Sequence, residues 1–330
     1  MSILIIMPQQ PQEAIFATAA IEAYRQRGSE KIVLLCAPSL VTLFTHDDRF
    51  LAVVPFEFSS VFRHWRQTSA FISQLLSDYG PFSAVVNLDA STRSVWLAGR
   101  IRTGVRAGYR AALTPPFVFK HLLKSDPALH RAEHYVAPIA ALSGQKPVKT
   151  PSMKLVPGRA DAPVSGSIGL IPSGPSGSPV EWGPHRWAES ALRLSAEYPL
   201  TLVSLADAEA SVERMDEVLR YNGVNRFERI PSSASWLQLR AVLSSLKGVI
   251  ATEGVLAQMS IALGIPTVVI FGPGNPALSG PLAGSAAALL YKKADCAPCA
   301  PGKPCPHLRR HCLETIAPQE AIAALKGLLR

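Results

Sequence analysis

Four of the five cysteines of this chain lie within seventeen residues, in the segment CAPCAPGKPCPHLRRHC, at Cys296, Cys299, Cys305 and Cys312. Two, five and six residues separate successive cysteines, and the prolines together with Gly302 allow so short a segment to fold back on itself. Four converging thiolates are the donor set of a tetrahedral zinc or iron site. Such a closed site would stabilise the chain without taking part in a reaction. Free thiols and disulfides are the alternatives, and clustered cysteines in a reducing compartment favour the metal.

A second group of residues that could bind a ligand is the basic stretch from Arg93 to Arg131. It holds eight Arg and Lys residues and one acid, Asp126, in a chain whose formal net charge is +9. Basic surfaces attract phosphates, nucleic acids and anionic membranes. No nucleic-acid-binding signature accompanies the charge, so we expect a phosphate-bearing or membrane partner and no nucleic acid. A solvated face is the alternative, because the charges are spread over almost forty residues.

Short apolar runs alternate with amphipathic stretches along the first half of the chain, the pattern of alternating strands and helices. The stretch 13–27 has a helical apolar face and stops at Gly28. Buried parallel strands are predicted on both sides of this helix and further along, at residues 2–7, 31–37 and 82–88. This is the βαβ opening of a parallel, doubly wound sheet.

A second series of strands and helices follows a linker. The segment 144–166 is rich in Pro, Gly and Lys and has no sustained apolar period. After it, apolar runs predict strands that begin at Ser167, Leu200, Lys247 and Pro266. We therefore predict two doubly wound α/β domains, residues 1–150 and 151–330. Their ligands are expected in a cleft between the domains, at the carboxyl ends of the strands.

The sequence also bears on location. It contains no run of eighteen apolar residues, which a membrane-spanning helix would need. The start, MSILIIMPQQ, lacks the basic leader and the cleavage site of a signal peptide. We therefore expect a cytoplasmic protein, with the basic stretch available for peripheral contact with the cytoplasmic face of the inner membrane.

Taken in order, the segments of the chain resemble glycosyltransferase family 9, which includes the lipopolysaccharide heptosyltransferases. The segments that carry the resemblance are ILIIMPQQPQEAIFATAAIEAYR, FSAVVNLDASTRSVWLAGRIRTGVRAGY, HRAEHYVAPIAALSG, WGPHRWAES, VIATEGVLAQMSIALGIPTVVIFGPGNP and, after the cysteines, IAPQEAIAA. The resemblance implies a GT-B fold, in which two Rossmann-like domains face a cleft. It also implies that the first domain binds the acceptor and the second binds a nucleotide sugar.

The resemblance places the catalytic base at Glu13. The family has a Gly-Asp pair at the start of the first helix, and its acid is the proposed base that deprotonates the acceptor hydroxyl. This chain has Gln12-Glu13 at that place, and a glutamate can accept the same proton from a position one methylene longer. The alternative is an acid that only complements the dipole of its helix.

The donor turn departs further from the family. Where the family has Asp-Thr-Gly-Pro-x-His, this chain reads Glu253-Gly254-Val255-Leu256-Ala257-Gln258, with the hydroxyl shifted to Thr252. Backbone amides at a helix start can still hold a diphosphate. The family's cationic Lys-Arg is replaced by Val180-Glu181, for which Arg186 could compensate. The donor-binding residues that we expect are Ser173, Gly174, Arg186, Asp207, Glu209, Thr252, Glu253, Gly254 and Gln258.

Three functions are compatible with these residues. The first is an inverting glycosyltransferase that moves a sugar, such as a heptose, from a nucleotide diphosphate donor to an anionic glycolipid or glycan, without a catalytic cofactor. In it the acceptor would be bound by Arg93, Arg100, Arg102 and Arg106. The altered donor turn favours two alternatives: a non-catalytic scaffold or binding subunit of the same fold, and a glycosyltransferase with another donor or a protein acceptor.

Overall fold

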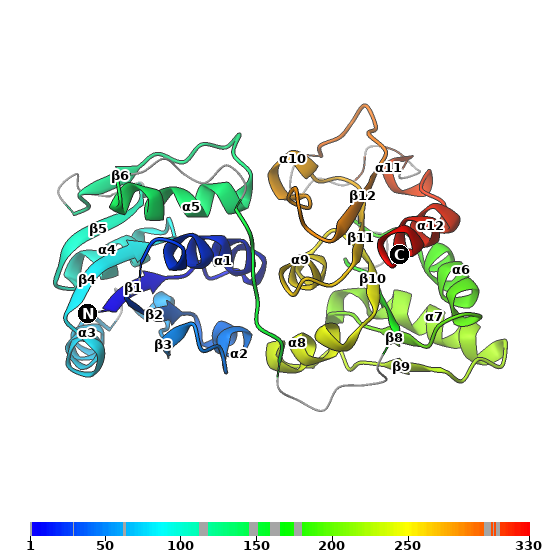
Figure 1. The fold of residues 1–330 in the computed structure, drawn as a ribbon, viewed down its shortest axis with the longest axis horizontal. Coiled ribbons are helices and arrows are strands. Elements are labelled where there is room, and N and C mark those ends of the chain that lie inside the picture. The colour runs from blue at the N-terminus through cyan, green and yellow to red at the C-terminus, as the bar shows by residue number, and fades with distance from the viewer. Residues whose placement is uncertain are drawn as a thin grey trace. The chain divides into compact units, whose positions relative to one another are not determined.

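The computed structural model describes residues 2–28, 30–61, 64–111, 118–144, 151–158, 166–174, 180–299, 305, 307 and 311–330. Figure 1 shows its ribbon. The chain divides into two compact units, Met1–Lys154 and Leu155–Arg330. Among the residues that the structure describes, no helix combines the length and the apolar composition that crossing a membrane needs.

The first unit is built on a parallel six-stranded sheet in the order β3-β2-β1-β4-β5-β6. Its strands are β1 (Ser2–Ile6), β2 (Lys31–Cys36), β3 (Phe50–Pro55), β4 (Phe82–Asn87), β5 (Thr103–Tyr109) and β6 (His121–Leu123). Its helices are α1 (Pro11–Arg25), α2 (Val41–Phe44), α3 (Trp65–Tyr79), α4 (Thr92–Arg100) and α5 (Arg131–Leu142), with the 3₁₀ helices η1 (Pro38–Leu40) and η2 (Phe58–Ser60).

Helices cover both faces of this sheet. The central strand β1 is buried along its whole length, as expected for a parallel strand between two helical layers. On one face, Leu4 and Ile6 share an apolar cluster with Ile72 of α3 and Val95 of α4. α1 and α5 pack against each other, and the small residues of α1, among them Ala17 and Ala20, are fully buried.

The second unit repeats the same plan in a sheet of order β12-β11-β10-β7-β8-β9, again with parallel pairing. Its strands are β7 (Ile168–Ile171), β8 (Leu200–Leu202), β9 (Phe227–Arg229), β10 (Gly248–Thr252), β11 (Thr267–Phe271) and β12 (Ala287–Tyr291). Its helices are α6 (Pro184–Ser195), α7 (Glu209–Tyr221), α8 (Trp236–Ser245), α9 (Val255–Ala262), α10 (Pro276–Ser279), α11 (His311–Glu314), α12 (Pro318–Leu328) and the 3₁₀ helix η3 (Ala206–Ala208).

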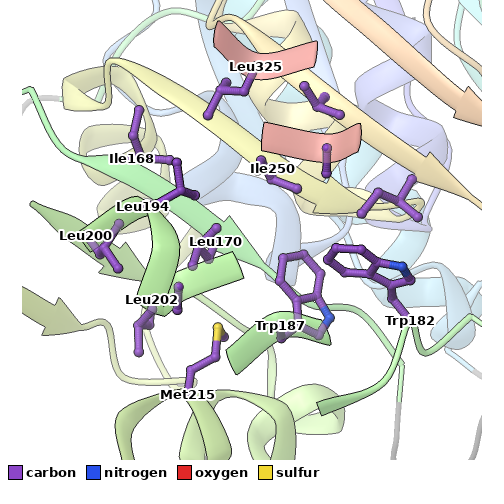
Figure 2. Packing of buried hydrophobic residues seen from close by; sticks show 14 of the residues in the cluster. Ile168, Leu170, Trp182, Trp187, Leu194, Leu200, Leu202, Met215, Ile250 and Leu325 are labelled. Carbon is purple, nitrogen blue, oxygen red and sulfur yellow. The ribbon is translucent and has the colours of Figure 1, made fainter. Parts of the chain in front are cut away.

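The core of the second unit is centred on two tryptophans at the start of α6. Trp182 and Trp187 form a T-shaped pair with ring centroids 5.1 Å apart, and both are buried among strand residues such as Leu170 and Ile250 (Figure 2). The indole N–H of Trp182 donates to the carbonyl of Ile316 at 3.0 Å. This N–H therefore fixes the chain just before α12 to the start of α6.

Both sheets have the strand order 3-2-1-4-5-6, counted within each unit. The order reverses between β1 and β4 in the first unit and between β7 and β10 in the second. Ligands of doubly wound sheets bind outside the carboxyl ends of the strands at this reversal. The fold predicted from the sequence, two doubly wound parallel sheets, is confirmed. A ligand site is therefore expected at each of the two strand reversals.

Candidate functional site

In the first unit, polar side chains follow both strands at the reversal. Gln9 comes shortly after β1, and Asp89 comes two residues after the end of β4. The amide Nε2 of Gln9 donates to Oδ2 of Asp89 at 2.9 Å, and the Ser91 hydroxyl donates to the same oxygen at 2.8 Å. These bonds join the two strand ends and hold a half-buried carboxylate there.

Glu13 lies in the first turn of α1, which follows Gln9 in the chain. The Tyr135 hydroxyl of α5 donates to Oε2 of Glu13 at 2.7 Å, and Nε of Arg131 lies 3.7 Å from Oε1. The Glu13 side chain is 27% exposed and the Arg131 side chain 51%. Burial and the Glu13 carboxylate raise the pKa of Tyr135, so the phenol keeps its proton and remains a donor. One carboxylate oxygen is thus fixed by Tyr135, and the other lies next to an accessible cation.

His134, also in the first turns of α5, carries no charge near pH 7. The His134 ring stacks on Tyr109 with centroids 3.9 Å apart. Burial, together with the nearby Arg131, lowers the pKa of His134 to about 4. Near pH 7 the histidine is therefore uncharged, and Arg131 supplies the positive charge beside Glu13.

The four arginines predicted to bind the acceptor do not form one group. Arg93 is exposed in the first turn of α4, whereas Arg100 lies at its other end, over the Trp96 ring at 4.6 Å. The two residues are seven positions apart in the helix, which corresponds to roughly 10 Å along the helix axis. Arg102 is exposed before β5. Their part in acceptor binding stays a prediction, and Arg131 is the basic residue that the structure brings to Glu13.

Arg106 has a structural contact that the sequence did not reveal. Its Nε donates to the carbonyl of Ala98 at 2.9 Å, and its Nη2 donates to that of Ile101 at 2.6 Å. These carbonyls lie at the end of α4, where helix carbonyls lack partners within the helix. Arg106 therefore caps α4 from β5.

This contact gives a stability prediction with a built-in comparison. Arg106→Gln should lower the free energy of unfolding by about 1–2 kcal/mol, because two carbonyls lose a charged donor. Arg102→Gln, at an exposed neighbouring position, should change it by no more than about 0.5 kcal/mol. Urea unfolding of the two variants measures both values, and equal losses would show that Arg106 does not cap α4.

In the second unit, the residues at the strand reversal come together at the start of α9. The backbone N–H of Ser173, after β7, donates to Oγ1 of Thr252 at the end of β10, at 2.8 Å. Gly254 precedes the first residue of α9, and a Cβ on it would lie 2.8 Å from Oγ of Ser173. Three of the predicted donor-binding residues are therefore neighbours beside the amides of a helix start.

The Glu253 side chain is engaged elsewhere. Its Oε1 accepts the backbone N–H groups of Gly272 and Gly274, at 3.0 and 3.1 Å, in the loop after β11. Burial raises the pKa of Glu253, and the two hydrogen bonds act in the opposite direction. The carboxylate therefore orders this loop.

Several other predicted donor residues make contacts within the unit. Gln258 is 1% exposed, and its Nε2 donates to the carbonyl of Ser279 at 2.8 Å. Nη2 of Arg186 donates to the carbonyl of Glu314 at 2.9 Å. Glu209 accepts hydrogen bonds from Arg229 and Ser204, while Asp207 is exposed in η3. Donor contacts of these four side chains stay predictions, as does that of Gly174, which is followed by residues 175–179 outside the described part of the chain.

The four clustered cysteines are all described and carry free thiols, although residues 300–304, 306 and 308–310 between them lie outside the described part. Burial raises the pKa of Cys312, and the thiols of Cys299, Cys296 and Cys305 raise it further. The thiols therefore share one locality. Within the described residues, no group of three or more His, Cys, Asp or Glu side chains is arranged so that it could hold a metal ion.

Sequence reasoning missed three residues of the first site: Gln9, Asp89 and Tyr135. The first two carried a usable signal, because each is polar and follows a buried strand. Tyr135 carried none, since it reaches Glu13 across 122 residues of sequence.

No protein-family model matches the sequence, and no curated protein matches it. Solved structures do match. The E. coli ADP-heptose lipopolysaccharide heptosyltransferase II shares 16% identity at a TM-score of 0.77, over 100% of this chain and 98% of that chain. The family 9 glycosyl transferase from Veillonella parvula shares 15% identity at a TM-score of 0.78, over 99% and 97%.

A third match contains a metal. The iron-containing heptosyltransferase TibC of E. coli, solved in complex with ADP-D-β-D-heptose, shares 12% identity at a TM-score of 0.57, over 99% of this chain and 76% of that chain. At these identities the matches establish the fold. Over its whole length, this chain therefore has the GT-B fold of the family 9 heptosyltransferases.

Proposed function

We propose that this chain is an inverting glycosyltransferase that moves a sugar from a nucleoside diphosphate donor to a hydroxyl of an anionic glycolipid-type acceptor. The observation that carries the proposal is Glu13, whose carboxylate stands at the strand reversal of the first unit with Tyr135 on one oxygen and Arg131 beside the other. A carboxylate held in this way, and partly open to solvent, can accept a proton from a bound hydroxyl.

The proposed reaction is one displacement. The acceptor oxygen forms a bond to the anomeric carbon as the bond from that carbon to the diphosphate breaks, and Glu13 takes the hydroxyl proton. Attack from the face opposite the leaving group inverts the anomeric configuration. In the second unit, the amides at the start of α9 and the Thr252–Ser173 pair would stabilise the diphosphate as it leaves.

We assign the binding of the donor and the binding of the acceptor to different parts of the chain. We assign the donor to residues 151–330 and propose ADP-heptose, because two proteins of the same fold carry this sugar nucleotide in their names or complexes. The acceptor is assigned to residues 1–150, where Arg131 and Arg93 would bind its phosphates or carboxylates. The same basic residues would support peripheral contact with an anionic membrane surface.

The test is transfer itself. The protein is incubated with ADP-heptose and phosphorylated glycolipid acceptors, and the product is analysed by mass spectrometry and by NMR at the anomeric centre. We expect ADP release that depends on the acceptor, and a product of inverted configuration. Release of ADP without any acceptor, or a product of retained configuration, would contradict the proposed single displacement.

A scaffold or binding subunit remains the second candidate. It is favoured by Glu253, which adds a half-buried acid directly before the helix start that would receive the diphosphate. Binding of an acceptor glycolipid without binding of any nucleotide sugar would support this function over the enzyme.

We further propose that the cysteine cluster holds one zinc or iron ion. The support is the donor set, four thiols in one locality, where burial and the neighbouring thiols raise the pKa of Cys299 and that of Cys312, and the likeness to an iron-containing protein of the same fold. Thiolates of Cys296, Cys299, Cys305 and Cys312 would supply a closed tetrahedral site, whose chemistry is structural.

We expect the purified protein to contain about one equivalent of zinc or iron, and a chelator to lower the melting temperature by destabilising the second unit. Elemental analysis and calorimetry measure the two effects. Four titratable thiols together with background metal content and an unchanged melting temperature would rule out the site. Cys36, buried in β2, serves as the comparison, because Cys36→Ser should leave the metal content unchanged.

A further inference from the structure

The first unit contains a cavity at the opposite end of α1 from Glu13. Its volume is about 280 Å³, and it is lined by residues near the amino ends of β1, β4 and β5 and at the carboxyl ends of α1 and α5. Gly28 and Ser143, at the two helix ends, line it and are exposed, so a ligand can enter from solvent. Glu13 lies in the first turn of α1, a helix of 15 residues, which corresponds to roughly 20 Å along its axis. The cavity is therefore separate from the candidate site at Glu13.

The apolar residues that line the cavity come from the three strands and from α5. They are Ile3, Ala84, Val105, Ile139 and Leu142. An apolar cavity of about 150 Å³ in another protein is large enough to bind benzene, whereas pockets for drug-sized ligands have volumes of about 300–1,000 Å³. The size of the cavity therefore fits a molecule with one aromatic ring or one short branched chain.

A carboxylate is held in place at this cavity. The hydroxyls of Tyr24 and Ser83 both donate to Oε2 of Glu30, at 3.1 and 2.6 Å, and all three residues line the cavity. Burial and the hydrogen bond to Glu30 raise the pKa of Tyr24, so the phenol keeps its proton and remains a donor. Both hydrogen bonds use Oε2, and Oε1 can therefore accept a hydrogen bond from a ligand.

The cavity is also lined by a residue of opposite charge, Arg27. Arg27 follows α1 and is half-buried, and its guanidinium carries five N–H donors in a plane that matches a carboxylate. α1 and α5 both end at the cavity, and the carboxyl ends of helices carry partial negative charge. A simple anion is therefore attracted by Arg27 but repelled by Glu30 and by both helix ends, and for a simple cation the signs are reversed. A molecule that carries both charges is attracted by both side chains.

We propose that the cavity binds an apolar amino acid. The ammonium group of the ligand would donate to the Glu30 carboxylate, and its carboxylate would accept hydrogen bonds from the Arg27 guanidinium. Its side chain, such as that of phenylalanine or leucine, would lie among the apolar residues of the three strands and α5. The proposed sugar transfer does not use this cavity, so the amino acid is a ligand in addition to the donor and the acceptor.

The experiment measures binding by calorimetry on the full chain with three related probes. L-phenylalanine carries both charges, 3-phenylpropionate lacks the ammonium group, and phenethylamine lacks the carboxylate. We expect one molecule of L-phenylalanine to bind per chain, and each of the other two probes to bind about tenfold or more weakly, because each loses one hydrogen-bonded charge pair. Absence of binding by both L-phenylalanine and L-leucine would overturn the proposal, as would an equal affinity for either of the other two probes.

Two variants test the assigned partners. Arg27→Gln should weaken binding of L-phenylalanine by about tenfold or more and should not weaken that of phenethylamine. Glu30→Gln should weaken binding of L-phenylalanine by a similar factor and should not weaken that of 3-phenylpropionate, while its amide oxygen can still accept from Tyr24 and Ser83. The matched control is Arg25→Gln, at an exposed position in the last turn of α1, which should leave all affinities unchanged. Equal affinities of Arg27→Gln and Arg25→Gln for L-phenylalanine would show that the amino acid binds elsewhere.

NMR on the unmodified protein locates the bound probe without any variant. L-phenylalanine should shift the backbone amide resonances of Gly28 and Ser143, which line the cavity. Should either charge variant not fold, the three probes and these shifts decide, and shifts that do not include Gly28 and Ser143 overturn the proposal. None of these measurements uses a sugar nucleotide, so their outcome is independent of glycosyltransferase activity.

Discussion

Glu13→Gln is expected to lower kcat for sugar transfer by about 10²-fold or more, with little change in donor affinity. The substitution keeps the size of the side chain and its place in the first turn of α1. It removes the oxygen that would accept the hydroxyl proton, while its remaining carbonyl oxygen can still accept the hydrogen bond from Tyr135. Steady-state rates and calorimetric donor affinity, measured on the same preparation, separate the two quantities.

Two further variants define the role of Glu13. Glu13→Asp should retain part of the rate, because it keeps the carboxylate and shortens its reach. Glu133→Gln removes another acid, at the start of α5, and should leave the rate unchanged. Turnover by Glu13→Gln at the unmodified rate would reduce Glu13 to an acid that complements its helix dipole.

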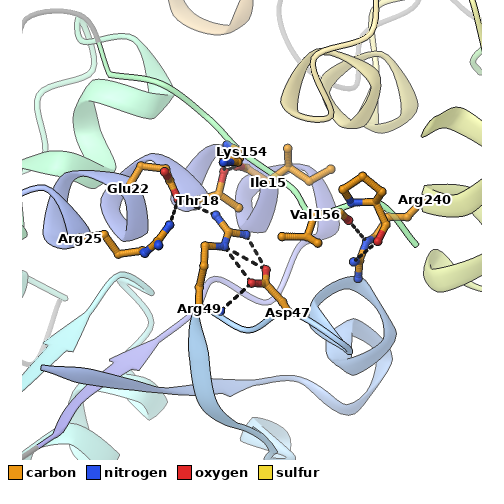
Figure 3. Close-up of polar contacts among 10 residues, drawn as sticks. Ile15, Thr18, Glu22, Arg25, Asp47, Arg49, Lys154, Val156 and Arg240 are labelled. Carbon is orange, nitrogen blue, oxygen red and sulfur yellow. Dashed lines mark hydrogen bonds and ion pairs between the residues drawn. The ribbon is translucent and has the colours of Figure 1, made fainter. Parts of the chain in front are cut away.

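Arg49→Met is expected to lower the free energy of unfolding by about 3–5 kcal/mol. Arg49 precedes β3, and its side chain is 2% exposed. Nη1 lies 2.6 Å from Oε1 of Glu22 in α1, and Nη2 lies 2.5 Å from Oδ2 of Asp47, whose side chain is 1% exposed (Figure 3). Removal of the guanidinium would leave buried carboxylate charge without its partner, which is the main cause of the expected loss.

The control for this prediction lies in the same cluster. Arg25 also faces Glu22, at 3.7 Å, but its side chain is 47% exposed. Arg25→Met should therefore change the stability by no more than about 0.5 kcal/mol. Denaturant unfolding followed by circular dichroism gives both free energies of unfolding. Similar losses of stability in Arg25→Met and Arg49→Met would show that burial of the Arg49 ion pairs does not cause the larger loss.

The parts of the fold that the sequence predicted are those with a strong local pattern. β1, β2, β4, β10 and β11 are apolar runs, almost wholly buried, and such runs can be recognised without knowing the neighbours. The strands β6 and β9 have three residues each, and β9 reads FER. Because these strands are short and lie at or near sheet edges, their pairing and not their composition makes them strands.

In the candidate sites, too, the residues that could be predicted are those with a local signal in the sequence. Glu13, Ser173, Thr252 and Gly254 follow from the order of strands and helices, because each stands at the carboxyl end of a strand or at the start of the next helix. Tyr135 and Arg131 reach Glu13 from α5, and only tertiary packing reveals such pairs. Gln258 was predicted from its position in the motif, and its donor contact stays a prediction, whereas its burial within the unit and its hydrogen bond to the carbonyl of Ser279 could be seen only in the structure.

The most direct test of the account is calorimetric titration of the unmodified protein with ADP-heptose. We predict that one molecule binds per chain, that Glu13→Gln binds it equally well, and that Gly254→Val weakens binding by about tenfold or more. The valine would place a Cβ 2.8 Å from Oγ of Ser173 and disturb the turn before α9. Failure of the unmodified protein to bind either ADP-heptose or ADP would contradict a nucleotide-sugar site at the start of α9, and with it the proposed glycosyltransferase.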